Sequence, residues 1–329
     1  MTETLLLTRR DVAELMPMED CIDALEQAFR AQAQGDSLPS KVLAIPTAEG
    51  GLHVKAAGLR RSRLYLAAKL NANFPRNPGR HGLPTIQGMV VLSDGDDGRQ
   101  LAVMDSIEIT ALRTGAATAV AARHLARPDA RTAAVIGCGM QALYQVRALA
   151  AVRPIGRIIA YDPEPGNAAR LAKRVTDQLG IAAAAVADVR AASHGCDIAV
   201  TCTPSRLPLL GPGDVAPGTF VAGVGADSPE KHELAPALLA DARIVTDSLE
   251  QAATIGDLHH ALVAQAVRRE DVHAELWELA AGMKRGRASE GEITVFDSTG
   301  VALEDVAAAA LVFERAVAAR RGGRVDFGE

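Results

Sequence analysis

A glycine-rich turn in the middle of the chain has the spacing of a dinucleotide-binding motif. Residues 133–142 read AAVIGCGMQA, so small and β-branched residues lead into Gly137-x-Gly139-x-x-Ala142 and then into an Ala- and Leu-rich run. In this order of strand, turn and helix, the first glycine permits the tight turn and the second lets the backbone approach the phosphates. The helix N-terminus then offers its N–H groups to the pyrophosphate.

A carboxylate at the end of the next apolar run favours NAD over NADP. Asp162 follows residues 158–161 (IIAY), close to the separation expected for the acid that binds the adenine-ribose hydroxyls. A carboxylate at this place would repel a 2′-phosphate, so we expect NAD(H) rather than NADP(H). The alternative is that Asp162 only caps the helix that follows.

Two later polar turns should lie at the same edge of the sheet. Residues 201–205 (TCTPS) and 224–231 (VGADSPEK) follow apolar runs, and ligands bind at the carboxyl ends of parallel strands. Asp227 would face the nicotinamide there, or would cap a helix beginning near Pro229. The residue types leave both possibilities open.

The elements that position these residues predict an α/β protein of two domains. From residue 131 strand-like and helix-like runs alternate, which predicts a Rossmann fold, a doubly wound parallel sheet. The preceding part predicts an α+β domain with a helix over 19–34 and a long loop over 73–84. Its expected strands are 52–57, 65–71, 85–93 and 99–105.

We expect the domains to be discontinuous in sequence. The substrate-binding and dimerisation domain should cover residues 1–127 and be completed by a C-terminal helix over 301–320. The NAD-binding domain should cover 128–300, and residues 321–329 should form a mobile tail.

Composition excludes several classes of function. The 329 residues are 48% hydrophobic and 23% charged, as in ordinary globular proteins, and the net charge of −5 argues against nucleic-acid binding. No apolar run is long enough for a membrane span and no signal peptide is visible, so a cytoplasmic protein is expected. The four cysteines have no paired spacing, and the adjacent His259 and His260 cannot both face one ion from a helix. We therefore expect no metal site.

Four motifs together resemble those of the ornithine cyclodeaminase/mu-crystallin family. They are residues 110–118 (TALRTGAAT), 137–142 (GCGMQA), 225–231 (GADSPEK) and 296–300 (FDSTG). The glutamine after the glycines and the Leu-Arg-Thr helix are more specific than a dinucleotide motif alone, and the resemblance covers nearly the whole chain. It implies a Rossmann domain, an N-terminal domain rejoined by the C-terminal helix, and a homodimer.

The resemblance also implies roles for individual residues. Asp227 matches the catalytic aspartate, Lys69 a lysine that is both catalytic and substrate-binding, and Arg113 the arginine that binds the substrate carboxylate. Further positions matched to substrate contacts are Lys41 and Thr299. The positions matched to cofactor contacts are Thr85, Arg113, Gly137, Gly139, Met140, Gln141, Asp162, Thr203, Val224, Gly225, Ala226, Asp227, Lys231 and Ser298.

Two positions depart from the family pattern. Lys41 stands where many members have an arginine, and a lysine keeps the charge but lacks the two-pronged fork. Lys55 adds a cation where ornithine-specific members differ, and residues 101–105 resemble the reductase and dehydrogenase branch.

These residue types fit hydride transfer at a carbon next to a carboxylate. Lys69 and Arg113 would hold the carboxylate, and Asp227 would give or take the proton on nitrogen. We expect an NAD-dependent reductase acting on a small imino or amino acid, resembling Δ1-pyrroline-2-carboxylate (ketimine) reductase. The alternatives are ornithine cyclodeaminase, alanine dehydrogenase, and a crystallin-like binding protein without catalysis.

Overall fold

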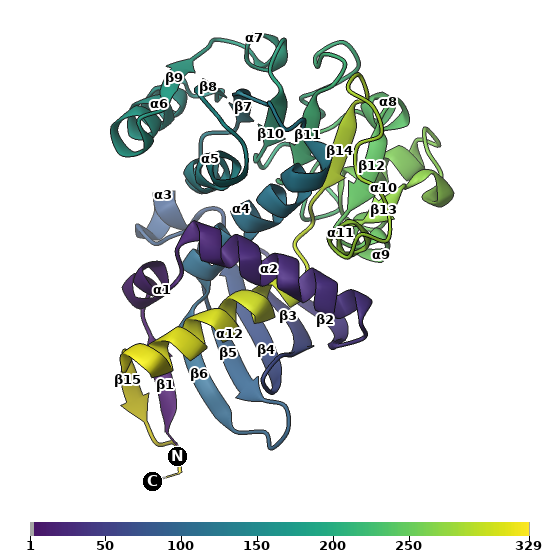
Figure 1. The fold of residues 1–329 in the computed structure, drawn as a ribbon. Helices are drawn as coiled ribbons and strands as arrows, with labels where there is room; N and C mark the ends of the chain where they lie inside the picture. Colours follow the sequence, from purple (N-terminus) through teal and green to yellow (C-terminus); the bar gives the residue numbers. More distant parts are fainter. Residues whose placement is uncertain (1–2, 329) are drawn as a thin grey trace. The chain divides into compact units, whose positions relative to one another are not determined.

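The structure, a computed structural model, describes residues 3–328 and divides into two compact units (Figure 1). The first unit contains the chain up to Arg113 and again from Val301 onward, and the second contains Thr114–Gly300. Helix α4 (Ser106–Leu125) therefore contributes residues to both units. In the described part of the chain, no helix is long and apolar enough to cross a membrane.

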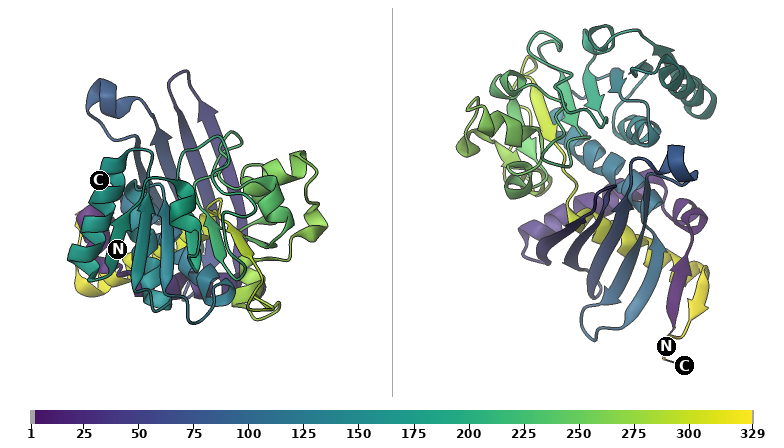
Figure 2. Two further views of the ribbon diagram at one scale, coloured as in Figure 1. Left: turned by 90° about the horizontal axis from the view of Figure 1, so that it is seen from above. Right: turned by 180° about the vertical axis from the view of Figure 1, so that it is seen from behind.

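The first unit is a seven-stranded, largely antiparallel sheet with helices on one face (Figures 1 and 2). Along the sheet the order is β15-β1-β6-β5-β4-β3-β2. The strands are β1 (Thr4–Leu7), β2 (Ser37–Pro46), β3 (Gly51–Arg60), β4 (Leu64–Asn73), β5 (Ile86–Asp94), β6 (Gln100–Asp105) and β15 (Gly323–Val325). The helices are α1 (Arg9–Leu15), α2 (Met18–Ala33), α3 (Asn77–His81) and α12 (Ala302–Ala319).

Alternation along β3 and β4 explains why only one face of this sheet is covered. Leu59, Tyr65 and Ala67 share one face and are buried, and α12 packs against β3, β4 and α2. The alanines of α12 let the helix approach the strands closely, because small side chains leave little between helix and sheet. Residues on the other face of the sheet remain partly exposed.

The second unit is an eight-stranded parallel sheet in the order β13-β12-β14-β11-β10-β7-β8-β9. The strands are β7 (Thr132–Ile136), β8 (Arg157–Tyr161), β9 (Ala182–Ala185), β10 (Ile198–Thr201), β11 (Phe220–Gly223), β12 (Arg243–Thr246), β13 (Ala274–Glu275) and β14 (Thr294–Asp297). The helices are α5 (Met140–Val152), α6 (Pro165–Leu179), α7 (Val189–Ser193), α8 (Pro236–Ala240), α9 (Leu249–Ala252), α10 (Asp257–Val263) and α11 (Leu276–Ala280). The central strands are buried on both faces, and the strand order reverses between β7 and β10. The predicted doubly wound α/β sheet is confirmed.

Several elements occur where the sequence predicted none, among them strands β1 and β2, helix α3 and strand β15. Loop 73–84 contains helix α3, whose first turn accommodates Pro78 because a first-turn N–H needs no partner. The expectation of a mobile tail is wrong for Gly323–Val325, which pair antiparallel with β1. Gly322, with φ of 96°, makes the reversal that brings this strand back.

The division between the units also lies earlier than the expected boundary after Arg127. The C-terminal end of α4 is held within the second unit, where Arg153 donates to the carbonyl oxygens of Ala122 and Ala126. Arg287 Nε donates to the Leu125 carbonyl at 2.8 Å. Because α4 continues through the division, the sequence shows no change of composition there. The turn Arg127-Pro128-Asp129, on which the expected boundary was based, lies after the end of this helix.

Candidate functional site

The glycine turn between β7 and α5 leaves backbone open where a phosphate could approach. Gly137 has φ of 93°, and a Cβ at this position would lie 2.5 Å from the Thr203 methyl group. A Cβ at Gly139 would meet nothing within 4 Å, and Gly139 caps α5 without any side-chain hydrogen bond. The first turn of a 13-residue helix therefore presents its N–H groups at an uncovered backbone.

Asp162 lies at this turn, directly after β8. Its carboxylate accepts the Cys138 N–H at 2.8 Å, and it also accepts the Glu164 N–H at 2.9 Å and the Asn167 amide at 3.0 Å. The acid thus contacts both the glycine turn and the start of α6. A ribose at the turn would find its hydroxyl acceptor already positioned.

Asp227 lies in the turn after β11, and the helix predicted from Pro229 is wrong. Residues 228–230 form a turn, and α8 begins only at Pro236. The side chain of Asp227 is 56% exposed, and its Oδ1 lies 2.5 Å from Nζ of Lys231. A capping role for Asp227 is thereby removed, while the carboxylate stays accessible to a reactant.

Other predicted cofactor residues of the second unit also lie after strands of the parallel sheet. Thr203, Val224 to Ala226 and Ser298 follow β10, β11 and β14, which are hydrogen-bonded neighbours. The Ser298 hydroxyl and the Gln141 side-chain oxygen are buried without a hydrogen-bond partner among residues 3–328. Buried polar atoms of this kind normally have partners, so both fit contacts to a bound molecule.

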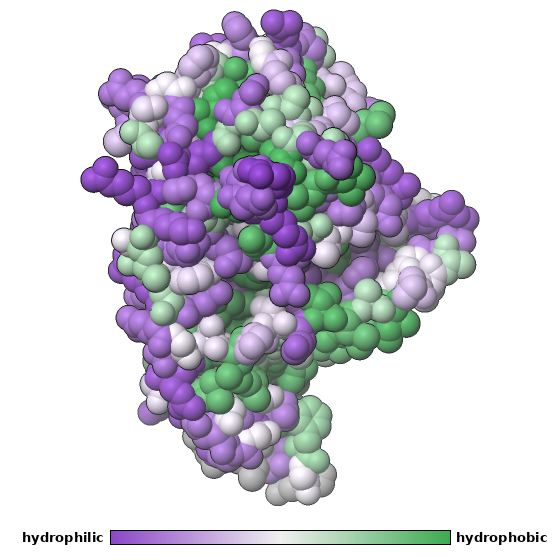
Figure 3. Space-filling model, turned by 90° about the vertical axis from the view of Figure 1, so that its right-hand side faces the viewer, coloured by the Kyte–Doolittle hydropathy of each residue, from purple (hydrophilic) through white to green (hydrophobic). Residues whose placement is uncertain are grey.

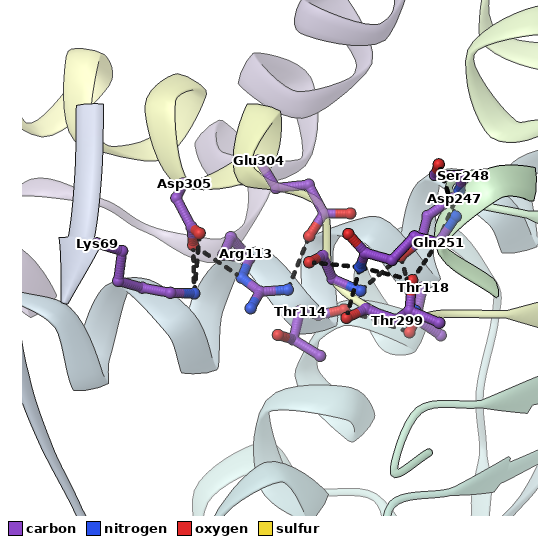
Figure 4. A network of polar contacts seen from close by, with 11 residues as sticks. Lys69, Arg113, Thr114, Thr118, Asp247, Ser248, Gln251, Thr299, Glu304 and Asp305 are labelled. Atoms are coloured by element: carbon purple, nitrogen blue, oxygen red, sulfur yellow. Dashed lines mark hydrogen bonds and ion pairs between the residues drawn. The ribbon is translucent and has the colours of Figure 1, made fainter. Parts of the chain in front are cut away.

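The remaining predicted positions have varied surroundings. Met140, the first residue of α5, is 58% exposed, and Thr85 is a half-buried residue just before β5 in the first unit. Thr299 is buried, and its hydroxyl donates to Asp247 at 2.8 Å and accepts from the Gln251 amide at 2.8 Å (Figure 4).

In the first unit, four buried charged side chains form one cluster (Figure 4). Lys69 on β4 and Arg113 on α4 are only 4% and 5% exposed. Lys69 Nζ lies 2.9 and 2.8 Å from the two oxygens of Asp305, and Arg113 Nε lies 3.1 Å from Asp305 Oδ1. Arg113 Nη1 donates to Glu304 at 2.8 Å. One carboxylate therefore bridges the two predicted substrate-binding cations.

Glu304 and Asp305 were not identified from the sequence. They occupy the first turn of α12, where acids are common because they interact favourably with the helix dipole. From the sequence, the two acids therefore look like ordinary residues of a helix N-terminus. The pattern that could have revealed them is a pair of adjacent acids followed directly by an unbroken apolar run, VAAAALV. Acids directly before such a run begin the part of the helix that packs in the core, and buried acids need cations.

Burial governs the proton affinities of this cluster. Burial and the neighbouring Arg113 lower the pKa of Lys69 to about 8, against the opposing effect of Asp305. Burial alone would raise the pKa of Asp305, but Lys69 and Arg113 hold that pKa below its usual value. The cluster thus combines an ionised acid with an amine that titrates near neutral pH.

The strand register places the other two lysines differently. Lys55 pairs directly with Lys69 across β3 and β4, so both side chains share one face. Lys41 pairs with Ala56, the neighbour of Lys55, and therefore belongs to the opposite face, where it is exposed. The sheet brings Lys55 to Lys69 and keeps Lys41 away from it.

No group of three or more histidine, cysteine, aspartate or glutamate side chains is arranged to hold a metal ion within residues 3–328. All four cysteines are free thiols.

Comparison with known proteins gives a match over the whole chain. Residues 2–320 match the model of the ornithine cyclodeaminase/mu-crystallin family. An archaeal alanine dehydrogenase dimer with bound NAD is similar, with a TM-score of 0.94, 40% identity, and coverage of 99% of both chains. The Δ1-pyrroline-2-carboxylate reductase of Thermococcus litoralis, in complex with NADH and L-proline, gives a TM-score of 0.93 at 33% identity, covering 98% of this chain and 100% of that one. The iminosuccinate reductase of Paracoccus denitrificans, in complex with NAD+, gives a TM-score of 0.90 at 34% identity, covering 98% of this chain and 99% of that one.

The family match agrees with the four motifs read from the sequence, and the structural matches agree with both units of the fold. This chain belongs to the ornithine cyclodeaminase/mu-crystallin family.

Proposed function

We propose that this protein is an NAD(H)-dependent oxidoreductase that reduces a small cyclic α-imino acid, of the Δ1-pyrroline-2-carboxylate type, to the corresponding amino acid. The observation that carries this proposal is the buried pair Lys69 and Arg113, two cations bridged by one carboxylate in a chain with a dinucleotide turn. Similar enzymes reduce Δ1-pyrroline-2-carboxylate and iminosuccinate, as their names state.

The residues present fit NAD. The open backbone at Gly139, the carboxylate of Asp162 and the orphaned polar atoms of Gln141 and Ser298 are the groups that would hold it. Bound NADH supplies the hydride. The similar structures hold NAD or NADH, in agreement with the expected preference over NADP.

The charged cluster would bind the carboxylate of the substrate. Lys69 and Arg113 are cations that lie next to each other, bridged by Asp305, and a carboxylate is the group that such a pair of cations binds. Holding the carboxylate fixes the position of the neighbouring carbon, and this orientation effect can lower the activation barrier by roughly 7–11 kcal/mol. Asp227 would supply the proton to the imine nitrogen in reduction and accept it in oxidation.

Lys55 favours a reductase over a cyclodeaminase. It lies directly across from Lys69 on the same face of the sheet, so a second ammonium group on the substrate would meet a like charge. Ornithine carries such a group and a cyclic imino acid does not.

The function is tested by following NADH absorbance with three sets of substrates. Oxidation of NADH by Δ1-pyrroline-2-carboxylate supports the proposal. Conversion of ornithine to proline and ammonia without net NADH change would replace it with a cyclodeaminase. The second candidate, favoured by 40% identity to an alanine dehydrogenase, predicts oxidation of NADH by pyruvate with ammonia instead. Faster turnover with NADPH would contradict the cofactor assignment.

The pKa of Lys69 predicts a pH limit for substrate binding. Because this pKa is about 8, the ammonium loses its charge as the pH rises through this value, and kcat/KM for the imino acid is expected to fall. The affinity for NADH, measured by fluorescence, should not follow this limit. In Lys69→Arg the cation stays charged at this pH. A fall of kcat/KM at the same pH in that variant would therefore mean that a group other than Lys69 causes it.

We also propose a homodimer formed through the uncovered face of the first unit's sheet. Leu38, Leu43, Ile45 and Met89 are each about half exposed and belong to this face by their pairing. Figure 3 views the side at which Figure 1 draws β2 and shows hydrophobic surface gathered there. Light scattering should give twice the chain mass, and Leu43→Glu together with Ile45→Glu should reduce it to one chain mass. A cytoplasmic location, as expected from the sequence, is also part of this proposal, and the four free thiols support it.

A further inference from the structure

The turns that follow β10 and β11 are tied together by one buried carboxylate. Oε1 of Glu233 accepts the backbone N–H of Thr203 at 2.6 Å and its hydroxyl at 2.7 Å. Oε2 accepts the backbone N–H of Gly225 at 2.6 Å and the Thr201 hydroxyl at 2.9 Å. Glu233 is completely buried. Each carboxylate oxygen thus holds a different turn.

Two further acids fix the segment that carries Glu233. Asp257 Oδ1 accepts the N–H groups of Glu233 and Leu234 at 2.7 and 2.8 Å. Asp297 in turn accepts the N–H groups of Asp257 and Leu258 at 3.3 and 2.8 Å. Burial raises the pKa of Glu233, while the hydrogen bonds from Thr203 and Gly225 lower it. Each acid of this series orients the backbone of the next.

The two turns are also in direct contact. A Cβ added at Gly225 would collide with the Thr203 carbonyl oxygen and with the carboxyl group of Glu233. Two residues further on, the N–H of Asp227 donates to the Gly225 carbonyl at 3.0 Å. The position of Gly225 therefore determines the position of the Asp227 backbone.

We infer that Glu233 is a positioning residue for the reaction, which sets the turn carrying Asp227 against the turn carrying Thr203. This inference rests on the proposed function, in which Thr203 contacts the cofactor and Asp227 transfers the proton. Glu233 itself touches neither reactant. Its effect would be to hold the bound cofactor and the proton donor in the correct positions relative to each other.

Glu233→Gln tests this role because two of the four groups that donate hydrogen bonds to the Glu233 carboxylate cannot act as acceptors instead. The hydroxyls of Thr201 and Thr203 can rotate to accept a hydrogen bond, but the N–H groups of Thr203 and Gly225 can only donate. Glutamine has one carbonyl oxygen, so its amide group must face one of these two N–H groups. One turn then loses its anchor, and a buried donor is left unpaired.

Asp197 offers a matched control at the opposite edge of the same sheet. This acid precedes β10, and its Oδ2 accepts the N–H groups of Arg131 and Thr132 at 2.8 and 2.9 Å, next to the start of β7. Its other oxygen contacts Arg127. Asp197→Asn therefore disturbs a comparable carboxylate clamp without touching the turns at the carboxyl edge.

The experiment measures NADH affinity by fluorescence, kcat and KM with NADH and Δ1-pyrroline-2-carboxylate, and Tm, on the full chain. We expect Glu233→Gln to weaken NADH binding and to lower kcat, each about tenfold or more. Asp197→Asn should lower Tm and leave both quantities within about twofold. The inference would be overturned if both variants lowered Tm equally and neither changed NADH affinity or kcat.

Glu233→Asp serves as a second variant if the glutamine variant does not fold. It keeps the charge, but its shorter side chain cannot reach both turns, so the same loss of NADH affinity and kcat is expected. Wild-type affinity in this second variant would overturn the inference. A wild-type protein that binds no NADH would instead overturn the proposed function and this inference with it.

Discussion

Replacing Asp227 with asparagine is expected to lower kcat by about 10²–10⁴-fold while NADH binding is retained. The asparagine amide cannot give or take the proton that reduction and oxidation at nitrogen require, and this is the usual contribution of a positioned acid or base. The side chain is 56% exposed and lies 2.5 Å from Lys231, and substitutions at exposed side chains have small effects on stability, so the fold should be unaffected. Steady-state kinetics and NADH fluorescence measure the two quantities separately.

Glu230→Gln is the control for this prediction. Glu230 is an exposed acid in the same turn, so its replacement removes a neighbouring negative charge without removing the proposed proton group. Its kcat should stay within about twofold of wild type, since surface substitutions of this kind have small effects. An unchanged kcat in Asp227→Asn would remove Asp227 from the mechanism.

The part of the site that the sequence predicted depends on local order along the chain. Gly137, Gly139 and the start of α5 are consecutive, and Asp162 ends the adjacent strand, so the spacing itself brings these residues together. The parallel sheet likewise follows from alternating runs, because right-handed crossovers leave few other arrangements.

The part that the sequence did not predict depends on distant partners. Asp305 is 236 positions from Lys69 and 192 from Arg113, and no spacing rule links residues so far apart. Glu233 lies in a polar segment that resembles an ordinary loop. Strand β2 contains Pro39 and exposed side chains, and it forms because the edge strand needs pairing on one side only.

The second large effect is expected at Asp305. Asp305→Asn removes the carboxylate that bridges Lys69 and Arg113 and leaves two buried cations with Glu304 as their remaining acid in the cluster. Breaking a buried ion pair in this way costs about 3–5 kcal/mol of unfolding free energy, because an uncompensated charge stays in a site of low polarity. Urea denaturation measures this loss.

Asp20→Asn provides a matched control, because Asp20 on α2 also pairs with the helix that carries Asp305. Asp20 pairs with Arg315 of α12 at 2.8 Å, but the two side chains are 41% and 36% exposed. Water screens this pair, so its loss should cost at most about 1 kcal/mol. Equal losses in the two variants would show that the buried cluster contributes no more than a surface pair.

The same variant separates a substrate site from a purely structural ion cluster. If Lys69 and Arg113 bind a carboxylate, then a ligand that carries one can replace the charge that Asp305→Asn removes. L-Proline, the product of the proposed reaction, should therefore raise the Tm of Asp305→Asn more than it raises that of wild type, because binding to the folded state stabilises it. Prolinamide, which lacks the carboxylate, should not have this effect. Equal shifts with both compounds, or none, would mean that the two cations serve the fold of the first unit and do not hold the substrate.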